Sequence, residues 1–313
     1  MFSYRHGFHA GNHADVLKHL CLVATVQHLM RKPTPLLMVD THAGAGLYRL
    51  DGDYALTSGE AQEGVLRLNP PDHAQDQAHA AARRSPSAAN NEADLVSDYL
   101  SLVASFNRGT ERRIYPGSPL LMFRLMDEPG RAEVRDRLKL FEMHPSDIQA
   151  LQGHVAQLDA GRRVSVHRED GFAGLKALLP PPPGAGGSRR ALVLIDPSYE
   201  IKSDYAKVAA SVQDALRRFA TGVYLVWYPI IPRPEAHDLP RRLRTLATQG
   251  ARPWLHATLA TGSGPERTGL SASGMFIINP PHTLAATLRA VLPGVRQALA
   301  QGPHAAWSVE TGD

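Results

Sequence analysis

Cysteine is nearly absent from this sequence: Cys21 is the one cysteine among 313 residues. A single cysteine excludes an internal disulfide and a zinc site built from cysteines. Long hydrophobic runs are also missing, because no apolar stretch approaches the roughly 20 residues that cross a membrane. The amino terminus, MFSYRHGFHAGNH, lacks the apolar core of a signal peptide. These absences predict a cytoplasmic protein that is not attached to a membrane.

The composition is that of an ordinary globular protein, with 43% hydrophobic and 20% charged residues. The net charge of +4 and the sequence pI of about 9.3 are basic, but too mildly so to require a nucleic-acid partner. Arginines gather in pairs along the chain, for example at Arg189–Arg190 and Arg217–Arg218. Such pairs can form a phosphate-binding face, but each pair taken alone is more typical of a solvated helix face.

Short apolar runs alternate with segments of helical periodicity through most of the chain. The runs that indicate buried strands are Leu36–Asp40, Leu138–Phe141, Val164–His167, Ala191–Asp196 and Val223–Tyr228. Strands that alternate with helices predict a doubly wound, mostly parallel sheet. Two further segments, Trp254–Thr261 and Met275–Asn279, are expected to pair as an antiparallel edge. Together they predict an α/β fold with a seven-stranded, Rossmann-like sheet.

Residues 51–114 interrupt this alternation with helical periods and polar sequence. A crossover between two parallel strands seldom needs so much chain. The stretch from Asp72 to Glu92 is poor in large apolar side chains, which is typical of a flexible insertion. We therefore expect residues 1–50 and 115–313 to form the main domain and residues 51–114 a small inserted helical subdomain.

Four successive predicted strands run into acids: Asp40, Glu142, Asp170 and Asp196. In a doubly wound sheet these strand ends lie along one edge, where ligands bind. The first acid precedes a loop with Gly44 and Gly46, and glycines let the backbone approach a ligand closely. Each acid alone is more often a helix cap, but the acids and the loop together predict a nucleoside-type site. There, Glu142 can accept hydrogen bonds from ribose hydroxyls and Asp170 from an adenine amine.

The fourth acid opens the turn Asp196-Pro197-Ser198-Tyr199, in which Pro197 cannot extend a central strand. The turn leaves Asp196 and Tyr199 for a second substrate. It resembles the [DNS]PP[YF] signature of the amino-methyltransferases, which use S-adenosylmethionine to methylate adenine N6, cytosine N4 or glutamine amides. Ser198 stands where the signature has a second proline, a departure that bears on the rigidity of the loop.

Further blocks of sequence resemble a single family. They are Phe8–His19, Asp40–Gly46, Tyr115–Pro119, Glu142–Asp147, Glu169–Gly171, Trp227–Ile230 and Gly274–Pro281. This set, which spans nearly the whole chain, is similar to the RlmJ family of 23S ribosomal RNA adenine-N6 methyltransferases. The resemblance implies a class I methyltransferase fold, with the main domain as the catalytic domain, S-adenosylmethionine as cofactor and 23S ribosomal RNA as partner. It implies no metal and no obligate protein partner.

The resemblance also implies roles for individual residues. Asp196 and the carbonyl of Pro197 would accept the two N6 hydrogens, Asp196 would act as general base, and Tyr199 would stack on the flipped-out adenine. The residues implied to hold S-adenosylmethionine are His19, His42, Gly44, Gly46, Ser118, Glu142, Asp170 and Gly171. Tyr4, His6 and Lys18 would lie near the substrate nucleotide at the mouth of the site.

Three alternatives remain open from the sequence. The same chemistry can act on DNA adenine or on a glutamine amide, although no DNA-recognition module stands out. A nucleic-acid-binding protein without activity can use the same fold. A Rossmann oxidoreductase is disfavoured, because the GxGxxG fingerprint is missing and His42 stands where its first glycine is expected.

Overall fold

The structure is a computed structural model that describes residues 6–68, 95–109, 113–128, 131, 133–183, 189–264 and 269–313. Its centre is one eight-stranded sheet with the strand order β10-β8-β9-β7-β6-β1-β4-β5. The strands are β1 (Leu37–Asp40), β4 (Arg137–Phe141), β5 (Val164–His167), β6 (Ala191–Ile195), β7 (Val223–Pro229), β8 (Trp254–Ala260), β9 (Ala272–Ile278) and β10 (Ala306–Gly312). Five neighbouring strands run parallel, in the order β7-β6-β1-β4-β5. Strands β9, β8 and β10 continue the sheet beyond β7 in antiparallel pairs.

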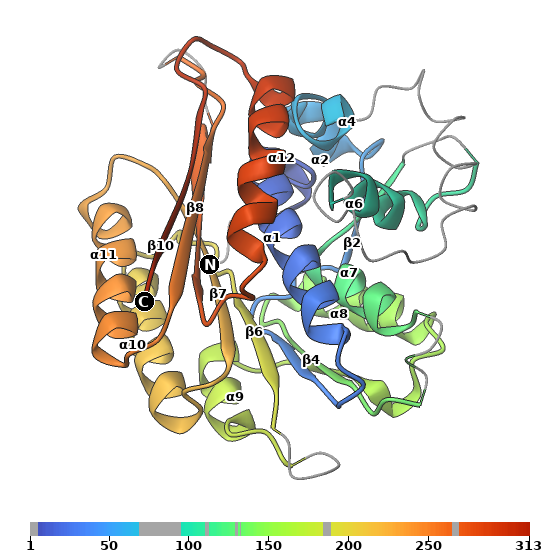
Figure 1. Cartoon of the computed structure of the whole chain (residues 1–313). Helices are drawn as coiled ribbons and strands as arrows, with labels where there is room; N and C mark the ends of the chain where they lie inside the picture. The colour runs from blue at the N-terminus through green and yellow to red at the C-terminus, as the bar shows by residue number, and fades with distance from the viewer. Residues whose placement is uncertain are drawn as a thin grey trace.

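Helices cover both faces of this sheet (Figure 1). One face carries α1 (His13–Met30), α7 (Ser118–Met126), α8 (Pro145–Ala156) and α12 (Leu284–Leu299). The other carries α9 (Gly171–Leu178), α10 (Ser203–Arg218) and α11 (Pro234–Gln249). Successive residues of a strand point to opposite faces. In β6, accordingly, Leu192 and Leu194 join the first core and Val193 and Ile195 the second.

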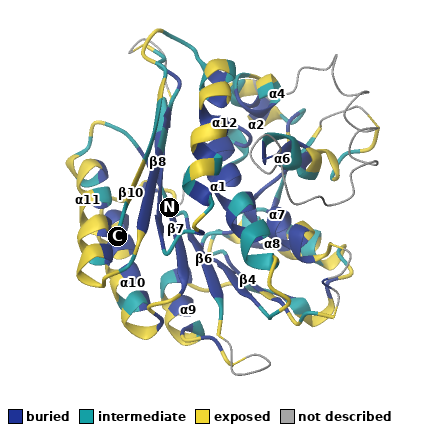
Figure 2. Ribbon diagram, viewed as in Figure 1, coloured by how far each residue is buried: buried dark blue, intermediate teal, exposed yellow. Residues whose placement is uncertain are grey.

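The central strands are buried along their whole length, as the dark blue ribbons in Figure 2 show. A parallel sheet with both faces covered needs apolar side chains at every position. This requirement explains why the core strands read as unbroken apolar runs and why their positions were predictable. The expected α/β, doubly wound fold is confirmed.

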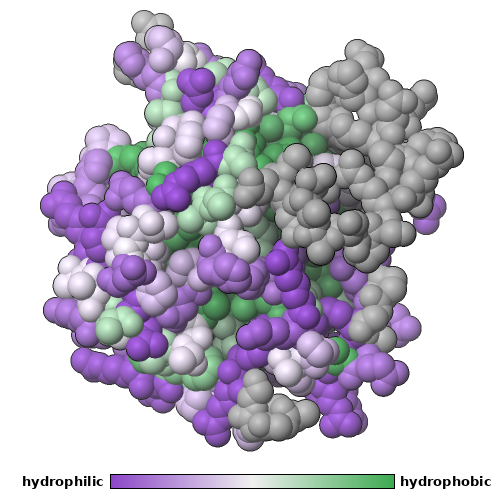
Figure 3. Space-filling view, in the orientation of Figure 1, coloured by the Kyte–Doolittle hydropathy of each residue, from purple (hydrophilic) through white to green (hydrophobic). Residues whose placement is uncertain are grey.

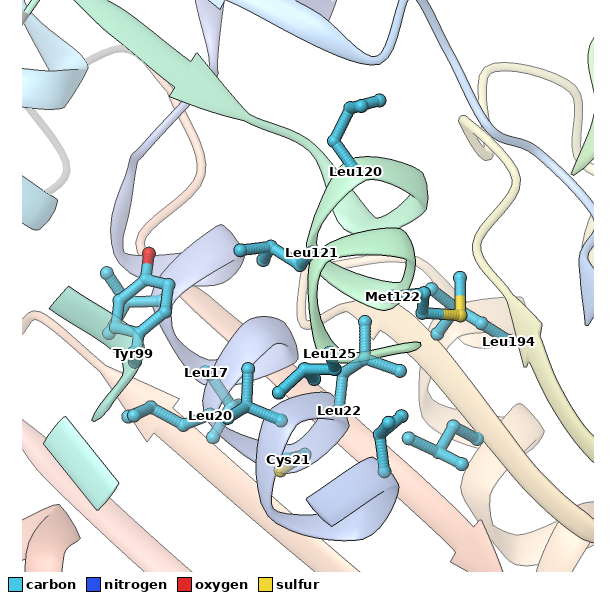
Figure 4. Packing of buried hydrophobic residues seen from close by; sticks show 14 of the residues in the cluster. Leu17, Leu20, Cys21, Leu22, Tyr99, Leu120, Leu121, Met122, Leu125 and Leu194 are labelled. Atoms are coloured by element: carbon cyan, nitrogen blue, oxygen red, sulfur yellow. The ribbon is translucent and has the colours of Figure 1, made fainter. Parts of the chain in front are cut away.

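Most residues of helix α1, which lies next to the site, are buried. Asn12 is its N-cap, and the Asn12 side chain accepts hydrogen bonds from the amides of Ala14 and Asp15. Leu17, Leu20 and Leu22 then pack with leucines of α7 (Figure 4). Because α1 is enclosed by the sheet, α6, α7 and α12, even its polar residues Asp15, Lys18 and His19 are removed from water.

The segment between β1 and α7 begins and ends with two short strands that lie side by side. Strands β2 (Leu47–Arg49) and β3 (Ile114–Pro116) pair antiparallel, so that Arg49 lies opposite Ile114. Between them come α2 (Asp53–Ser58), α3 (Glu60–Glu63), α4 (Val65–Leu68) and α6 (Leu95–Ala104). Helices α3, α4 and α6 share one apolar cluster with α1, while the predicted flexible stretch 72–92 lies outside the described residues.

The sheet has eight strands where seven were expected. The additional strand is β10, which pairs with β8 from Ala306 opposite Ala260 to Gly312 opposite Trp254. Its side chains are exposed or only half-buried, and its sequence AWSVETG contains polar residues and glycine. An edge strand of this kind has no apolar run to reveal it.

Hydrophilic residues are spread over most of the face seen in Figure 3, with hydrophobic residues between them in smaller groups. Within the described ranges, no helix combines the length and the apolar character needed to cross a membrane.

Candidate active site

A cavity of about 360 Å³ opens at the carboxyl ends of β1, β4 and β6. This is the edge at which open α/β sheets bind ligands. The predicted site residues that line it are His6, Lys18, His42, Gly44, Ser118, Glu142, Asp170, Gly171, Asp196 and Pro197. Residues from distant parts of the sequence therefore meet in one space.

Glu142 forms one end of the cavity, directly after β4. Its two carboxylate oxygens accept hydrogen bonds from the backbone amides of Gly44 (2.8 Å) and His144 (2.6 Å). Burial raises the pKa of Glu142, and the amides only partly offset this effect. The carboxylate is thus oriented by fixed neutral donors and keeps lone pairs for a ligand, as a ribose diol requires.

Asp40, the first acid of the series, lies beneath the cavity and is fully buried. The hydroxyl of Ser118 donates to Asp40 Oδ2 at 2.6 Å, and the His42 amide donates to Oδ1 at 3.2 Å. Burial raises the pKa of Asp40 to about 6, while the Ser118 hydrogen bond lowers it. Asp40 therefore orients two residues that do line the cavity.

Asp170 has two roles in the structure. It is the N-cap of α9 and accepts a hydrogen bond from the Phe172 amide at 2.9 Å. It also lines the cavity, together with Phe172, whose ring lies 5.0 Å from the His42 ring. Asp170 can therefore cap α9 and contact a ligand in the cavity at the same time.

Gly171 is required by close packing, because a Cβ there would lie 2.1 Å from the carbonyl oxygen of Thr41. His42 follows Thr41 in the loop after β1. Burial lowers the pKa of His42 to about 4, so its ring is neutral at pH 7.

A chain of buried charges forms the other end of the cavity. Lys18 Nζ lies 2.6 Å from Asp196 Oδ2 and 2.8 Å from Asp15 Oδ1. Asp15 Oδ2 in turn accepts from the Gly11 amide and lies 3.0 Å from His6 Nε2. Lys18 is 5% exposed and Asp15 is 2% exposed, so this network is shielded from solvent.

Lys18 and Asp15 hold each other ionised. Burial lowers the pKa of Lys18, but the carboxylates of Asp15 and Asp196 raise it well above its usual value. Burial likewise raises the pKa of Asp15, but His6 and Lys18 bring it well below the ordinary range. Sequence reasoning missed Asp15, and its three-residue spacing from Lys18 at the start of α1 is the signal that could have indicated the pair.

Tyr199 does not line the cavity in this structure. Its φ of 53° turns the ring inward, where Tyr199 is 2% exposed and its hydroxyl donates to the Trp227 carbonyl at 2.6 Å. The Tyr199 ring packs 4.5 Å from Tyr205 and 6.0 Å from Trp227. The loop instead presents Pro197, Ser198 and Ile201 to the cavity.

Two other predicted residues, His19 and Gly46, do not line the cavity, although the structure describes both. His19 is fully buried beneath it, with Nδ1 2.8 Å from the Tyr115 hydroxyl. Gly46 packs against Leu120 and Leu151, which a Cβ would meet at 2.7 and 2.8 Å. Tyr4 lies outside the described residues.

The side chains on the cavity wall fit an adenosine. Glu142 and Asp170 provide carboxylate acceptors on the cavity wall, and Phe172 provides an aromatic face. Beneath the cavity, His19 Nε2 is buried without a hydrogen-bond partner in the described parts of the chain. Burial lowers the pKa of His19 to about 3, so it is a neutral donor or acceptor. No group of metal-ligating side chains is found among the residues that the structure describes.

Comparison with known proteins shows which family this chain resembles. Residues 33–311 match the family model described as ribosomal RNA large subunit methyltransferase D, RlmJ. Ribosomal RNA large subunit methyltransferase J of Escherichia coli K12 is 40% identical over 299 residues, 96% of this chain and 94% of that protein.

Two further relatives agree. The protein of the same name from Haemophilus influenzae is 36% identical over 314 residues, with 99% of this chain and 98% of that protein covered. A crystal structure of a protein from Legionella pneumophila is similar with a TM-score of 0.77 at 28% identity, covering 97% of this chain and 99% of that one. The chain belongs to the ribosomal RNA large subunit methyltransferase J (RlmJ) family.

Proposed function

We propose that this protein transfers a methyl group from S-adenosylmethionine to the exocyclic N6 amine of an adenine in 23S ribosomal RNA. The observation that carries the proposal is the placement of Asp196. Its carboxylate stands at the carboxyl end of β6 on the cavity wall, with Lys18 on Oδ2. Oδ1 is the acceptor that we assign to the amine.

The chemistry requires help from the protein because the lone pair of an adenine amine is delocalised into the ring. S-adenosylmethionine, when bound, supplies an electrophilic methyl carbon. Asp196 Oδ1 and the Pro197 carbonyl accept the two N6 hydrogens and so favour a pyramidal nitrogen with a directed lone pair. Asp196 then takes the surplus proton as general base. Lys18 is already protonated, because its pKa is well above the usual value, and cannot compete for that proton.

The opposite end of the cavity binds the cofactor. Glu142 accepts from the ribose hydroxyls, Asp170 from the adenine amine, and Phe172 covers the base. Ser118, His42, Gly44 and Gly171 complete this end, and His19 and Gly46 support it from below. This division leaves the Asp196 end for the RNA.

The nucleotide-binding residues are Tyr4, His6, Lys18 and Tyr199. His6 and Lys18 line the cavity beside Asp196. For Tyr199 to stack on a flipped-out adenine, its ring must leave its packed position against Tyr205 and Trp227. Its left-handed backbone is a strained conformation for a bulky residue, which favours such a change.

The substrate we propose is protein-free 23S RNA, or an early assembly form, that no obligate protein partner presents to the enzyme. Residues 1–50 and 115–313 act as the catalytic domain, and residues 51–114 form an insertion. The family match to large-subunit RNA methyltransferases supports this substrate.

The test is methyl transfer from labelled S-adenosylmethionine to protein-free 23S RNA by the wild type and by Asp196→Ala. We expect N6-methyladenine with the wild type and at least about 100-fold slower transfer with the variant. Cofactor binding to the variant, measured by calorimetry, should be retained and exclude misfolding. Label on duplex DNA or on a glutamine amide would overturn the substrate, and a wild type that does not bind the cofactor would favour a non-enzymatic RNA-binding protein.

A further inference from the structure

We infer that Glu60, in the inserted segment, is a positioning residue for the reaction, because it clamps the turn that carries His6 and begins α1. The inference rests on the proposed function for its catalytic consequence. The residues that make up this clamp are Ser58, Glu60 and Val65 on the inserted side, and Phe8, His9, Gly11 and Asn12 on the amino-terminal turn. The inserted segment then contributes to the reaction by holding the turn that precedes α1.

Glu60 makes the central contacts of the clamp. Its Oε2 accepts a hydrogen bond from Asn12 Nδ2 at 2.8 Å, and its Oε1 lies 3.0 Å from His9 Nδ1. Glu60 is partly buried, with its side chain 24% exposed, so water competes only in part for these contacts. Hydrogen bonds to a charged acceptor are roughly twice as strong as neutral ones.

Backbone contacts on either side of Glu60 reinforce the clamp. The Ser58 hydroxyl donates to the Phe8 carbonyl, and the Val65 amide donates to the Gly11 carbonyl at 2.7 Å. The two segments touch so closely that a Cβ on Gly64 would lie 2.0 Å from the Gly11 carbonyl oxygen. The inserted helices therefore fix the backbone of the turn on both sides of His9.

From the clamp, a continuous path of polar contacts leads to Asp196. Asn12, held by Glu60, caps α1 through the amides of Ala14 and Asp15. Asp15 then contacts Lys18, which lies against Asp196. Every contact on this path is 2.9 Å or shorter.

The contacts on this path fix the position of Lys18 and Asp196 and do not themselves take part in the reaction. A small displacement of a catalytic group can cost about 100-fold in rate even when the change is far from the reacting atoms. At the cofactor end, Glu142 and Ser118 are held outside this path by Gly44, His144 and Asp40, and His19 of α1 has its own contact with the Tyr115 hydroxyl. Loosening the clamp should therefore affect the methyl-transfer step and leave cofactor affinity unchanged.

The experiment compares Glu60→Ala and Glu60→Gln with Asp53→Asn in the full chain. Asp53 is an exposed acid in the same insertion and serves as the matched control. We expect Glu60→Ala to lower kcat for RNA about tenfold, with the dissociation constant of S-adenosylmethionine within twofold of wild type. Glu60→Gln, whose amide can still bond to Asn12 and His9, should recover most of the rate, and Asp53→Asn should match the wild type.

A double variant separates positioning from general stability. In a Lys18→Met background the path is already broken, so Glu60→Ala should lower kcat by less than twofold further. If the kcat losses of the two substitutions multiply in full, the inference is wrong. It is equally wrong if Glu60→Ala keeps kcat within twofold of wild type, or loses cofactor binding together with rate.

A readout without catalysis keeps this inference distinct from the proposed function. Hydrogen exchange at the Ala14 and Asp15 amides, which Asn12 caps, should be at least about tenfold faster in Glu60→Ala than in Asp53→Asn. If the wild type lacks RNA methylation but this exchange difference is found, the function is wrong and the clamp stands. Equal exchange in the two variants overturns the clamp whatever the activity.

Discussion

The two ends of the cavity use the same residue type in opposite ways. At the cofactor end, Glu142 and the underlying Asp40 accept hydrogen bonds from neutral donors, and burial raises the pKa of both. At the Asp196 end, the buried Asp15 is paired with Lys18 and His6, and its pKa is well below the ordinary value. A buried carboxylate therefore does not have one fixed behaviour, because its partners decide the direction of its pKa shift.

This difference suits the two tasks. A cofactor pocket needs acceptors that are fixed in direction, and backbone amides provide that without adding charge. In the function that we propose, Asp196 must keep its position while the adenine enters the cavity. The buried ammonium group of Lys18 holds it there. Changing a partner at one end should therefore affect the two ends differently.

The largest effect should follow from Lys18→Met. The substitution leaves Asp15 and Asp196 without their shared cation, and breaking a buried ion pair costs about 3–5 kcal/mol. We expect the free energy of unfolding, measured by urea denaturation, to fall by that amount and methyl transfer to slow by at least about 100-fold, with a residual rate that remains measurable. Lys207→Met is the control, because Lys207 is half-exposed beside Asp204 and such pairs contribute about 0–1 kcal/mol. If both lysine variants have equal stability, the Asp196 end is not the ionic site described above.

Asp40→Asn tests the neutral-donor end through its pH dependence. In the folded protein the pKa of Asp40 is about 6, against an ordinary 3.8, so the folded state binds the proton more tightly. Its contribution to stability is present below about pH 4 and is lost as the pH rises through about 6. The free energy of unfolding of Asp40→Asn, relative to that of the wild type, should therefore rise by about 2–3 kcal/mol between pH 4 and pH 7. Urea denaturation at both pH values measures the shift, and a difference that does not change with pH would contradict it.

Gly171→Ala tests the packing of the cofactor end. The new Cβ would overlap the Thr41 carbonyl oxygen at 2.1 Å, so α9 must move away from the loop after β1. Overpacking of this kind costs about 1–3 kcal/mol, and we expect S-adenosylmethionine affinity to fall about tenfold or more. Gly153→Ala in α8 is the control, since nothing lies within 4 Å of its Cβ and a helical alanine is favourable. Equal affinities of the two variants in a calorimetric titration would show that this close contact does not shape the cofactor end.

The smallest effect is expected for Asp170→Asn, which separates capping from binding. Asparagine caps a helix as well as aspartate does, so the free energy of unfolding should change by less than about 0.5 kcal/mol. The loss of a charged acceptor for the adenine amine should weaken cofactor binding several-fold, by about 1 kcal/mol. If binding is unchanged by Asn but stability falls with Asp170→Ala, Asp170 is only a cap.

Much of the fold was predictable because burial leaves a signal in the sequence. Strand β5 has the bounds expected from its apolar run, and β1, β4, β6 and β7 differ by a residue or so at their ends. The acids that follow three of these strands, Glu142, Asp170 and Asp196, do meet at one cavity. Local patterns sufficed there because the topology of a parallel sheet brings strand ends together.

What could not be predicted depends on contacts between distant residues. Lys18 and Asp196 are 178 positions apart, and no local pattern shows that they touch. The inward turn of Tyr199 depends on a positive φ that a tyrosine rarely adopts. Strands β2 and β3 have only three residues each, too short for a periodic pattern. These features are fixed by tertiary structure, and they lie next to the site.

Strand β10 also covers the edge of β8, where the sheet would otherwise be open to pairing with another chain. Without it, β8 (Trp254–Ala260), which is largely buried and apolar, would present unpaired amides and carbonyls along seven residues. Exposed edges of that length are templates for aggregation. The opposite edge needs no such cover, because β5 is only four residues long and carries Ser165 and His167 bonded to each other. A chain that ends before Ala306 should therefore keep its cavity residues but precipitate from solution.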